Sequence, residues 1–228
     1  MINTPIWNEP AWCQSVLGKS IELYASEDPE KLAEKKPIIF IGGMHGDEPE
    51  GVLLAEQWLN WLKNHDSDKF KPWILVTCIN PDGYQLNERT NGRGVDLNRN
   101  FPSKCWITDC EESRYYPGDS PASEPEVAAL VELINKTSPS LIVHFHSWQP
   151  SIVYSNEKGK WAAKLLAQCS GYELQPDIGY PTQGSLGEYG ANDLDIQVIC
   201  IEELEGQKLA TIFPRFKQGL IEIVSSKT

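Results

Sequence analysis

Four short apolar runs, rich in Ile and Val, punctuate the chain. They cover residues 37–43, 73–79, 141–146 and 197–202. Continuous apolar runs of this length are typical of central strands that are buried on both faces of a sheet, because a strand with one wet face alternates apolar and polar residues. The pattern therefore predicts the core of a parallel or mixed sheet.

Amphipathic stretches with apolar residues at helical spacing lie between and after these runs. One begins after Pro49, which suits a first helical turn, and a second follows Ser123-Glu124-Pro125-Glu126, which has the form of a capping box. Residues 161–169 and the segment around Phe216 predict two more helices. We expect one α/β domain over residues 1–228, with a mixed, mostly parallel twisted sheet covered by helices on both faces.

Composition narrows the classes of partner. The 228 residues carry a formal net charge of -12, which opposes binding to phosphate backbones or to an anionic membrane. Residues 1–20 have no basic start followed by an apolar core, and no segment approaches the length of a membrane span. The sequence therefore predicts a soluble cytoplasmic protein that binds neither nucleic acid nor membrane.

The six cysteines are scattered, and none forms a Cys-x-x-Cys pair. This spacing predicts neither a thiolate zinc site nor a redox motif, so free thiols are expected. Cys105 and Cys110 are close enough in the sequence to form a disulfide if the compartment were oxidising.

A candidate metal site follows the first apolar run. His45 and Glu48 lie three residues apart in His-Gly-Asp-Glu, at the mouth of the predicted strand, and both side chains can face one cation from a single turn. Zinc accepts imidazole nitrogen and carboxylate oxygen, and a catalytic zinc usually has three protein ligands. A third ligand is therefore expected downstream. Taken alone, His-x-x-Glu also occurs by chance at a turn or at the start of a helix.

Residues 80–122 form the longest stretch without a regular pattern, and a loop of this length inside a compact domain is usually functional. It contains Asn-Pro-Asp-Gly-Tyr at 80–84. Further along, Asn98 and Arg99 offer an amide and a bidentate guanidinium that suit a carboxylate, and Arg89 could hold a second anionic oxygen. The alternative is that these residues cap turns and pair with surface acids.

Two later strands end in further candidates. His144 and His146 alternate with Phe145, so they share a face, and the spacing does not decide which one binds a metal. Glu202 and Glu203 point to opposite faces, so at most one of them faces the site. The remaining histidine, His65, lies in a polar segment and is expected to be solvated.

Taken in order, these motifs resemble the zinc metallocarboxypeptidase family. The resemblance runs from about residue 38 to residue 204 and, within the family, it is strongest to the bacterial murein tripeptide amidase A group, which cleaves the γ-D-glutamyl to diaminopimelate bond. It rests on one ordered set: His45-x-x-Glu48, Asn-Pro-Asp-Gly at 80–83, Arg89, Asp96-Leu97-Asn98-Arg99-Asn100-Phe101, His146 and Glu202.

The resemblance implies a role for each matching position. His45, Glu48 and His146 would bind one zinc ion, and Glu202 would be the general base for the attacking water. The remaining roles fall on residues that contact substrate: Arg89 for the scissile carbonyl, Asn98 and Arg99 for the free carboxylate of the released residue, and Tyr180 as a mobile side chain over it. His144 would then be a buried partner of the ligands.

The sequence departs from the murein amidase pattern beside the pocket. Ser147-Trp148 stands where that group tends to have Asp-Pro, Glu203 where an apolar residue is usual, and Cys200 where Thr is common. We therefore expect the reaction to be kept and the substrate, a murein tripeptide or a similar small peptide, to be less certain. The alternatives are a zinc carboxypeptidase of other peptides, an aspartoacylase-like or desuccinylase-like deacylase, and a non-catalytic binding protein. The oligomeric state and the metal loaded in a cell do not follow from the sequence.

Overall fold

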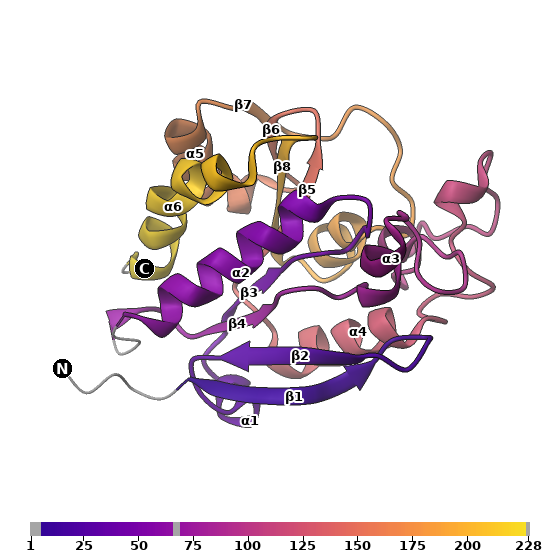
Figure 1. The fold of residues 1–228 in the computed structure, drawn as a ribbon, viewed down its shortest axis with the longest axis horizontal. Helices are drawn as coiled ribbons and strands as arrows, with labels where there is room; N and C mark the ends of the chain where they lie inside the picture. The colour runs from indigo at the N-terminus through magenta and orange to yellow at the C-terminus, as the bar shows by residue number, and fades with distance from the viewer. Residues whose placement is uncertain (1–5, 66–68, 227–228) are drawn as a thin grey trace.

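A computed structural model describes residues 6–65 and 69–226 (Figure 1). These residues build one eight-stranded mixed sheet in the spatial order β1-β2-β4-β3-β5-β8-β6-β7. The strands are β1 (Trp7–Gln14), β2 (Ser20–Ala25), β3 (Ile38–Ile41), β4 (Trp73–Val76), β5 (Leu141–Trp148), β6 (Ser151–Tyr154), β7 (Glu173–Gln175) and β8 (Gln197–Leu204). The expected α/β fold with a mixed sheet is confirmed.

Helices cover both faces of the sheet, as expected from two-sided burial. α2, α5 and α6 pack on one face, and α1 and α4 lie on the other (Figure 1). The helices are α1 (Pro29–Leu32), α2 (Pro49–Lys63), α3 (Pro81–Leu86), α4 (Pro125–Thr137), α5 (Lys160–Ser170) and α6 (Leu209–Ser225). Two separate apolar cores result, one on each side of the sheet.

The four predicted strands are the centre of the sheet. β3, β4, β5 and β8 run parallel to their neighbours in this group, and every residue of β3 and β4 is buried. Because parallel strands end at the same edge, the residues that follow β3 and those at the ends of β5 and β8 meet there. In the β5–β8 pair, His146 lies opposite Glu202.

Four strands at the two sides of the sheet were not predicted. β1 contains Pro10 and is mostly exposed, and β7 has only three residues, so neither carries a continuous apolar run.

The predicted capping box before α4 is wrong. The N-cap is Glu124, no side chain caps the helix, and the Ser123 hydroxyl donates to the Glu124 carboxylate instead. The loop 80–122 is also less irregular than expected, because α3 begins with Pro81 and is capped by Asn80.

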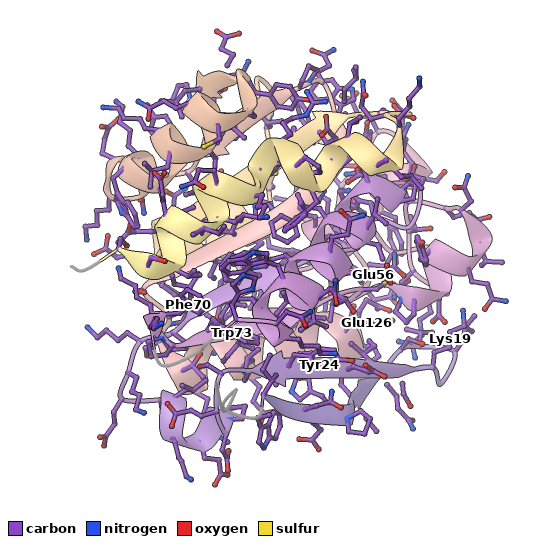
Figure 2. The ribbon with its side chains drawn as sticks, turned by 60° about the vertical axis from the view of Figure 1, so that its left-hand side comes forward. Lys19, Tyr24, Glu56, Phe70, Trp73 and Glu126 are labelled. Atoms are coloured by element: carbon purple, nitrogen blue, oxygen red, sulfur yellow. The ribbon has the colours of Figure 1, made fainter. Side chains whose placement is uncertain are left out.

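Three buried acids, Asp82, Glu124 and Glu126, lie near the β1–β2 hairpin and are here called the hairpin anchor; Asp82 and Glu126 fix the hairpin to the domain, and Glu124 supports them through Asn91, which it shares with Glu126. Asp82 accepts a hydrogen bond from the Leu17 amide at 3.0 Å, and Glu126 accepts one from the Val16 amide at 3.0 Å. Figure 2 shows Lys19 and Glu126 on this side of the molecule. The hairpin turn thus replaces solvent around carboxylates that are expensive to bury.

Within the described residues, no helix is long and apolar enough to cross a membrane.

Candidate active site

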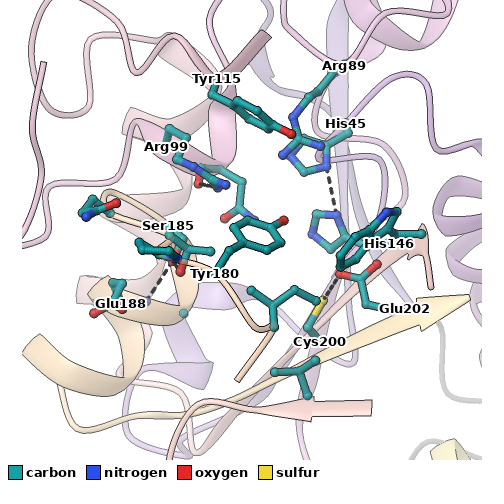
Figure 3. Close-up of a pocket in the computed structure, with 18 of the residues that line it drawn as sticks. His45, Arg89, Arg99, Tyr115, His146, Tyr180, Ser185, Glu188, Cys200 and Glu202 are labelled. Carbon is teal, nitrogen blue, oxygen red and sulfur yellow. Dashed lines mark hydrogen bonds between the residues drawn. The ribbon is translucent and has the colours of Figure 1, made fainter. Parts of the chain in front are cut away.

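The carboxyl edge of the central strands opens into a cavity of about 1120 Å³. His45 follows β3, His146 and Glu202 stand near the ends of β5 and β8, and all three side chains line the cavity (Figure 3). The long segment 80–122 supplies Arg89, Asn98 and Arg99 to the same cavity. Every position that the sequence proposed for the site is therefore brought to one place.

Three of these residues, His45, Glu48 and His146, form a tight group that we call the metal cluster. The Nδ1 atoms of His45 and His146 lie 3.1 Å apart, and the two oxygens of Glu48 lie 2.6 Å from His45 Nδ1 and 2.7 Å from His146 Nδ1. All three residues are buried, with exposed fractions of 3, 8 and 3 %. Two facing imidazole nitrogens and a carboxylate leave room for a cation or a proton between them and for little else.

Electrostatics support the same interpretation. Burial alone would raise the pKa of the Glu48 carboxyl, but His45 and His146 outweigh it and hold that pKa below its usual range. Burial and Arg89 act to lower the pKa of His45, yet Glu48 and Asp96 leave it raised. The cluster therefore favours positive charge at its centre. Two imidazoles, one carboxylate and an open cavity suit a catalytic zinc, so the residues present fit the ion.

Each imidazole of the metal cluster has a buried partner behind it. His45 Nε2 lies 3.1 Å from Asp96 Oδ1, and His146 Nε2 lies 2.8 Å from His144 Nδ1. A partner at Nε2 fixes the ring so that Nδ1 keeps its lone pair for a metal. His144 thus lies directly behind His146, and burial holds the pKa of the His144 imidazole well below its usual value.

Glu202 and Glu203 separate as the alternation predicts. Glu202 faces the cavity, where Cys200 Sγ donates to its Oε1 at 3.1 Å (Figure 3). Burial raises the pKa of the Glu202 carboxyl and raises that of the Cys200 thiol well above its ordinary value. Glu203 points to the other face, where it contacts Tyr172 and lies 3.3 Å from Arg215 Nε. Glu203 is therefore a structural acid.

Two arginines supply positive charge to the cavity. Arg89 Nε donates to Asp96 Oδ2 at 2.9 Å, and its Nη1 lies 3.5 Å from Glu48 Oε1. Arg99 is held by a hydrogen bond from Nη1 to the Asn98 carbonyl at 2.8 Å. The Asn98 side-chain oxygen accepts from the Leu186 amide at 3.0 Å, and its amide nitrogen makes no hydrogen bond with the residues that the structure describes, so it can donate to an anion. These groups can bind two separate oxygens of a ligand.

Aromatic rings form the mouth of the cavity. Tyr180 is 43 % exposed, and its ring lies 6.0 Å from the Arg99 guanidinium (Figure 3). The ring packs edge-on against Trp148 at 5.7 Å. Its position at the mouth agrees with a side chain that covers a bound residue. His65, in contrast, lies just beyond the end of α2, stacks on Trp61 and is exposed. Its polar neighbours 66–68 lie outside the described residues.

Sequence reasoning gave no role to three residues that shape this site. Asp96 was named only as part of a motif, yet it joins His45 to Arg89. The Tyr115 ring lies 5.2 Å from the Arg89 guanidinium and 5.6 Å from that of Arg99. Glu50 accepts from the Ser147 hydroxyl at 2.7 Å and so holds the strand end that follows His146. Only Asp96 had a signal in the sequence, its place two residues before Asn98.

A family model described as zinc carboxypeptidase matches residues 11–207, which include every residue of the site. The chain belongs to the zinc carboxypeptidase family. Two relatives of the chain are murein peptide amidases. Murein peptide amidase A of Escherichia coli K12 is 35 % identical over 187 residues, which cover 76 % of this chain and 74 % of the relative. Murein peptide amidase A of Vibrio campbellii is 28 % identical over 204 residues, which cover 83 % and 76 %.

Solved structures of this family have the same fold. The murein-tripeptide amidase of Escherichia coli O157 superposes with a TM-score of 0.76 and 28 % identity, covering 100 % of this chain and 96 % of that one. The carboxypeptidase A of Helicoverpa armigera superposes with a TM-score of 0.77 at 18 % identity, covering 96 % and 67 %. Membership of the zinc carboxypeptidase family makes this chain a metallopeptidase that hydrolyses peptide-like amide bonds with zinc.

Proposed function

We propose that this chain hydrolyses the amide bond between γ-D-glutamate and meso-diaminopimelate in small murein peptides, with one zinc ion held by His45, Glu48 and His146. The observation that carries the zinc site is the convergence of two Nδ1 atoms and a carboxylate within 3.1 Å at the end of the cavity. The murein substrate is supported by the similarity to two murein peptide amidases, at 35 and 28 % identity.

When bound, zinc supplies a Lewis acid that polarises a carbonyl group and lowers the pKa of a water molecule. Glu202 takes the proton from the attacking water on Oε2, because its Oε1 is occupied by the Cys200 thiol. The same carboxyl then delivers the proton to the leaving amine nitrogen, which completes general acid-base catalysis by one side chain.

Arg89 and Arg99 contact different oxygens of the substrate in this proposal. Arg89 donates to the scissile carbonyl oxygen as negative charge develops on it, which is the role of an oxyanion-hole donor. Asn98 and Arg99 bind the free carboxylate of the residue that leaves, so the enzyme removes one terminal residue. Tyr180 covers that residue at the mouth of the cavity. In this proposal residues 1–228 act as one catalytic domain. The protein acts in the cytoplasm, where all six cysteines are expected to be free thiols. Its peptide substrates come from murein recycling.

A carboxypeptidase of other peptides is the second candidate. Trp148 borders the cavity where the murein amidases tend to have proline, and the acids Asp47, Asp177 and Glu205 also line it. A negative mouth disfavours the polyanionic murein tripeptide unless the arginines outweigh it. The deacylase and the non-catalytic binding protein have no comparable support from the structure.

The test is release of meso-diaminopimelate from L-Ala-γ-D-Glu-meso-diaminopimelate by the zinc-loaded protein, measured beside a panel of ordinary peptides with free carboxyl termini. Glu202→Gln should bind zinc normally and lose about 10²- to 10⁴-fold in turnover, the usual contribution of a general base. Glu203→Gln is the matched control one residue along, and it should keep its turnover.

The alternative outcomes separate the candidates. Cleavage of ordinary peptides without the tripeptide would reject the murein substrate and keep the zinc peptidase. An inactive Glu203→Gln with an active Glu202→Gln would refute the assignment of the base. If the zinc-loaded protein cleaves none of the peptides, both candidate reactions are rejected.

A further inference from the structure

The positive side of the cavity is built around one aromatic ring. The guanidinium carbons of Arg89, Arg99 and Arg114 lie 5.2, 5.6 and 5.4 Å from the ring centre of Tyr115. All four residues line the cavity, and Figure 3 shows Tyr115 beside both Arg89 and Arg99. An arginine within about 6 Å of a ring centre is attracted by the negative face of the ring. Three cations therefore share one neutral neighbour.

The three arginines differ in the acids beside them. Arg89 Nε donates to Asp96 Oδ2 at 2.9 Å, and Arg114 Nη2 lies 3.7 Å from Asp47 Oδ2. Arg99 has no acid within ion-pair distance among the described residues, and its Nη1 donates to a backbone carbonyl instead. Arg99 is nevertheless only 8 % exposed. A buried charge without a partner is costly, so something other than a carboxylate must offset the burial of Arg99.

An acid beside Arg99 would prevent the arginine from binding a ligand. A carboxylate of the protein would occupy the same N–H groups that a ligand carboxylate needs, and it would cancel the charge that attracts the ligand. An aromatic face attracts the guanidinium through its quadrupole and occupies none of the in-plane N–H groups. The Tyr115 ring at 5.6 Å, together with the Tyr180 ring at 6.0 Å, therefore lowers the cost of burying Arg99 and leaves its N–H donors available.

Tyr115 also links the two arginines that are proposed to contact substrate. The side chain of Arg89 is 11 % exposed, and two buried guanidiniums of like charge repel each other more strongly than they would in water. Because Arg89 and Arg99 both lie against the same ring, their attraction to it opposes this repulsion and fixes the spacing between them. Arg114 contacts the ring as well, but its side chain is 53 % exposed and pairs with Asp47, so it belongs to the rim of the cavity.

We propose that Tyr115 is a positioning residue, whose ring stabilises the buried charge of Arg99 and orients Arg99 and Arg89 toward the two oxygens that they bind. This proposal rests on the proposed function for the roles of the two arginines, and it does not depend on which residue is released. The ring keeps Arg99 buried and charged without an acid of the protein. The binding of a ligand with a free carboxylate should therefore depend on the ring, and the binding of its neutral amide should not.

The first test changes the electrostatics of the ring and keeps its shape. Tyr115→Phe is compared with proteins that carry, at the same position, phenylalanine with one, two or three ring fluorines, which withdraw electron density from the face of the ring. Binding of L-leucine and of L-leucinamide to each zinc-loaded protein is measured by isothermal titration calorimetry. The affinity for L-leucine should fall with each fluorine, by about 3- to 30-fold over the series, as expected for the loss of a buried cation–π contact. The affinity for L-leucinamide should stay constant.

A second test separates the ring from simple packing during turnover of a cleaved peptide. Tyr115→Leu fills much of the same space without an aromatic face, so it should raise KM through Arg99 and lower kcat through Arg89, each by about 3- to 30-fold. Tyr115→Phe keeps the face and should restore both constants to within about threefold of the wild type. The matched control is Tyr116→Leu, one residue along, because the Tyr116 hydroxyl donates to Asp119 and its side chain lies outside the cavity lining.

Three outcomes would overturn the role of Tyr115. Constant affinity for L-leucine across the fluorine series would mean that the ring acts by its shape alone. Equal losses for L-leucine and L-leucinamide would mean that the effect does not depend on a carboxylate. A wild-type protein that prefers neither ligand would mean that Arg99 holds no charge available to a ligand.

Titration with meso-diaminopimelate distinguishes this proposal from the proposed function. If L-leucine binds and meso-diaminopimelate does not, the murein substrate is rejected, and the fluorine series with L-leucine still decides the role of Tyr115. If meso-diaminopimelate binds and its affinity does not change across the fluorine series, the role of Tyr115 is rejected and the murein substrate is kept.

Discussion

Two buried polar clusters, the hairpin anchor and the metal cluster, both contain carboxylates, and they differ in what satisfies their hydrogen-bond acceptors. In the hairpin anchor, Glu124 accepts from Asn91 Nδ2 at 2.7 Å and from the Ser123 hydroxyl at 2.8 Å. Its other members accept from backbone amides of the hairpin turn. Each of these acids thus meets a hydrogen-bond donor, and Lys19 Nζ lies 3.4 Å from the remaining oxygen of Asp82, so the group needs no bound ion.

In the metal cluster, by contrast, hydrogen-bond acceptors face one another. The Nδ1 atoms of His45 and His146 face each other and share the two oxygens of Glu48, while the N–H groups of both rings point outward to Asp96 and His144. Such a group is stable only with a positive charge at its centre. The comparison shows that burial and charge alone do not mark a functional site. A functional site is marked instead by the direction in which its hydrogen-bond donors point.

The largest expected effect is on turnover, and it comes from removing the arginine beside the metal cluster. The arginine beside the hairpin anchor provides the control. Arg89→Ala should lose about 10²- to 10³-fold in turnover, because it removes a donor to the developing oxyanion. It should keep zinc, since Arg89 is not one of the three residues that converge on the ion site. Steady-state rates and zinc content, measured on the same preparation, check both statements.

The matched control is Arg93→Ala, which removes the arginine beside the hairpin anchor. Arg93 Nη1 lies 3.5 Å from Glu124 Oε2 and its side chain is 57 % exposed, so its removal should leave the rate unchanged and cost little stability. Near-wild-type turnover of Arg89→Ala would show that Arg89 only holds Asp96.

A smaller effect is expected from the acid behind His45. Asp96→Asn places an amide where a carboxylate accepts from His45 Nε2 and Arg89 Nε, so it weakens the fixation of the ligand ring. Zinc affinity should fall by about 10- to 100-fold, measured by competition with a chelator. Asp82→Asn makes the same change in the hairpin anchor and should leave zinc affinity unaltered. If both variants bind zinc equally well, the partner behind His45 does not tune the site.

Much of the fold could be predicted because its central strands carry their own signal. β3, β4, β5 and β8 are apolar on both faces, which only a covered parallel sheet requires. The hairpin β1–β2 could not be read in this way. Its amides are bound by carboxylates that are 65 and 110 residues away in the sequence, Asp82 for the Leu17 amide and Glu126 for the Val16 amide. A local pattern does not contain that contact.

The same distinction between local patterns and long-range contacts applies to the residues of the site. Residues at strand ends could be placed, because parallel strands bring them to one edge. The choice between His144 and His146 could not be made by alternation, since both share the face that meets the cavity. Glu202 and Glu203 needed the tertiary structure as well, because the face used depends on where α6 brings Arg215. The place of Tyr115 over two arginines depends on the path of a long loop.

The smallest effect concerns stability and belongs to the hairpin anchor. Burial raises the pKa of the Glu126 carboxyl above its ordinary value of 4.5, and the nearby Glu124 adds to this, although hydrogen bonds from Val16 and Asn91 act against it. The folded protein therefore binds this proton more tightly than the unfolded chain, so the contribution of Glu126 to the free energy of unfolding declines as pH rises above 4.5. Glu126→Gln should remove that decline and change stability at neutral pH by about 1 kcal/mol or less, since the side-chain oxygen that accepts from Val16 is kept.

Denaturant unfolding of the wild-type protein and Glu126→Gln at a series of pH values above 4.5 measures this difference, with Glu132→Gln on the exposed side of α4 as control. The difference between wild type and Glu126→Gln should change with pH in favour of the variant, while zinc content and turnover stay as in the wild type. Parallel curves for all three proteins would mean that Glu126 ionises as easily in the folded protein as in the unfolded chain. The backbone amides of the hairpin would then satisfy the charge completely, and the contrast with the metal cluster would be sharper still.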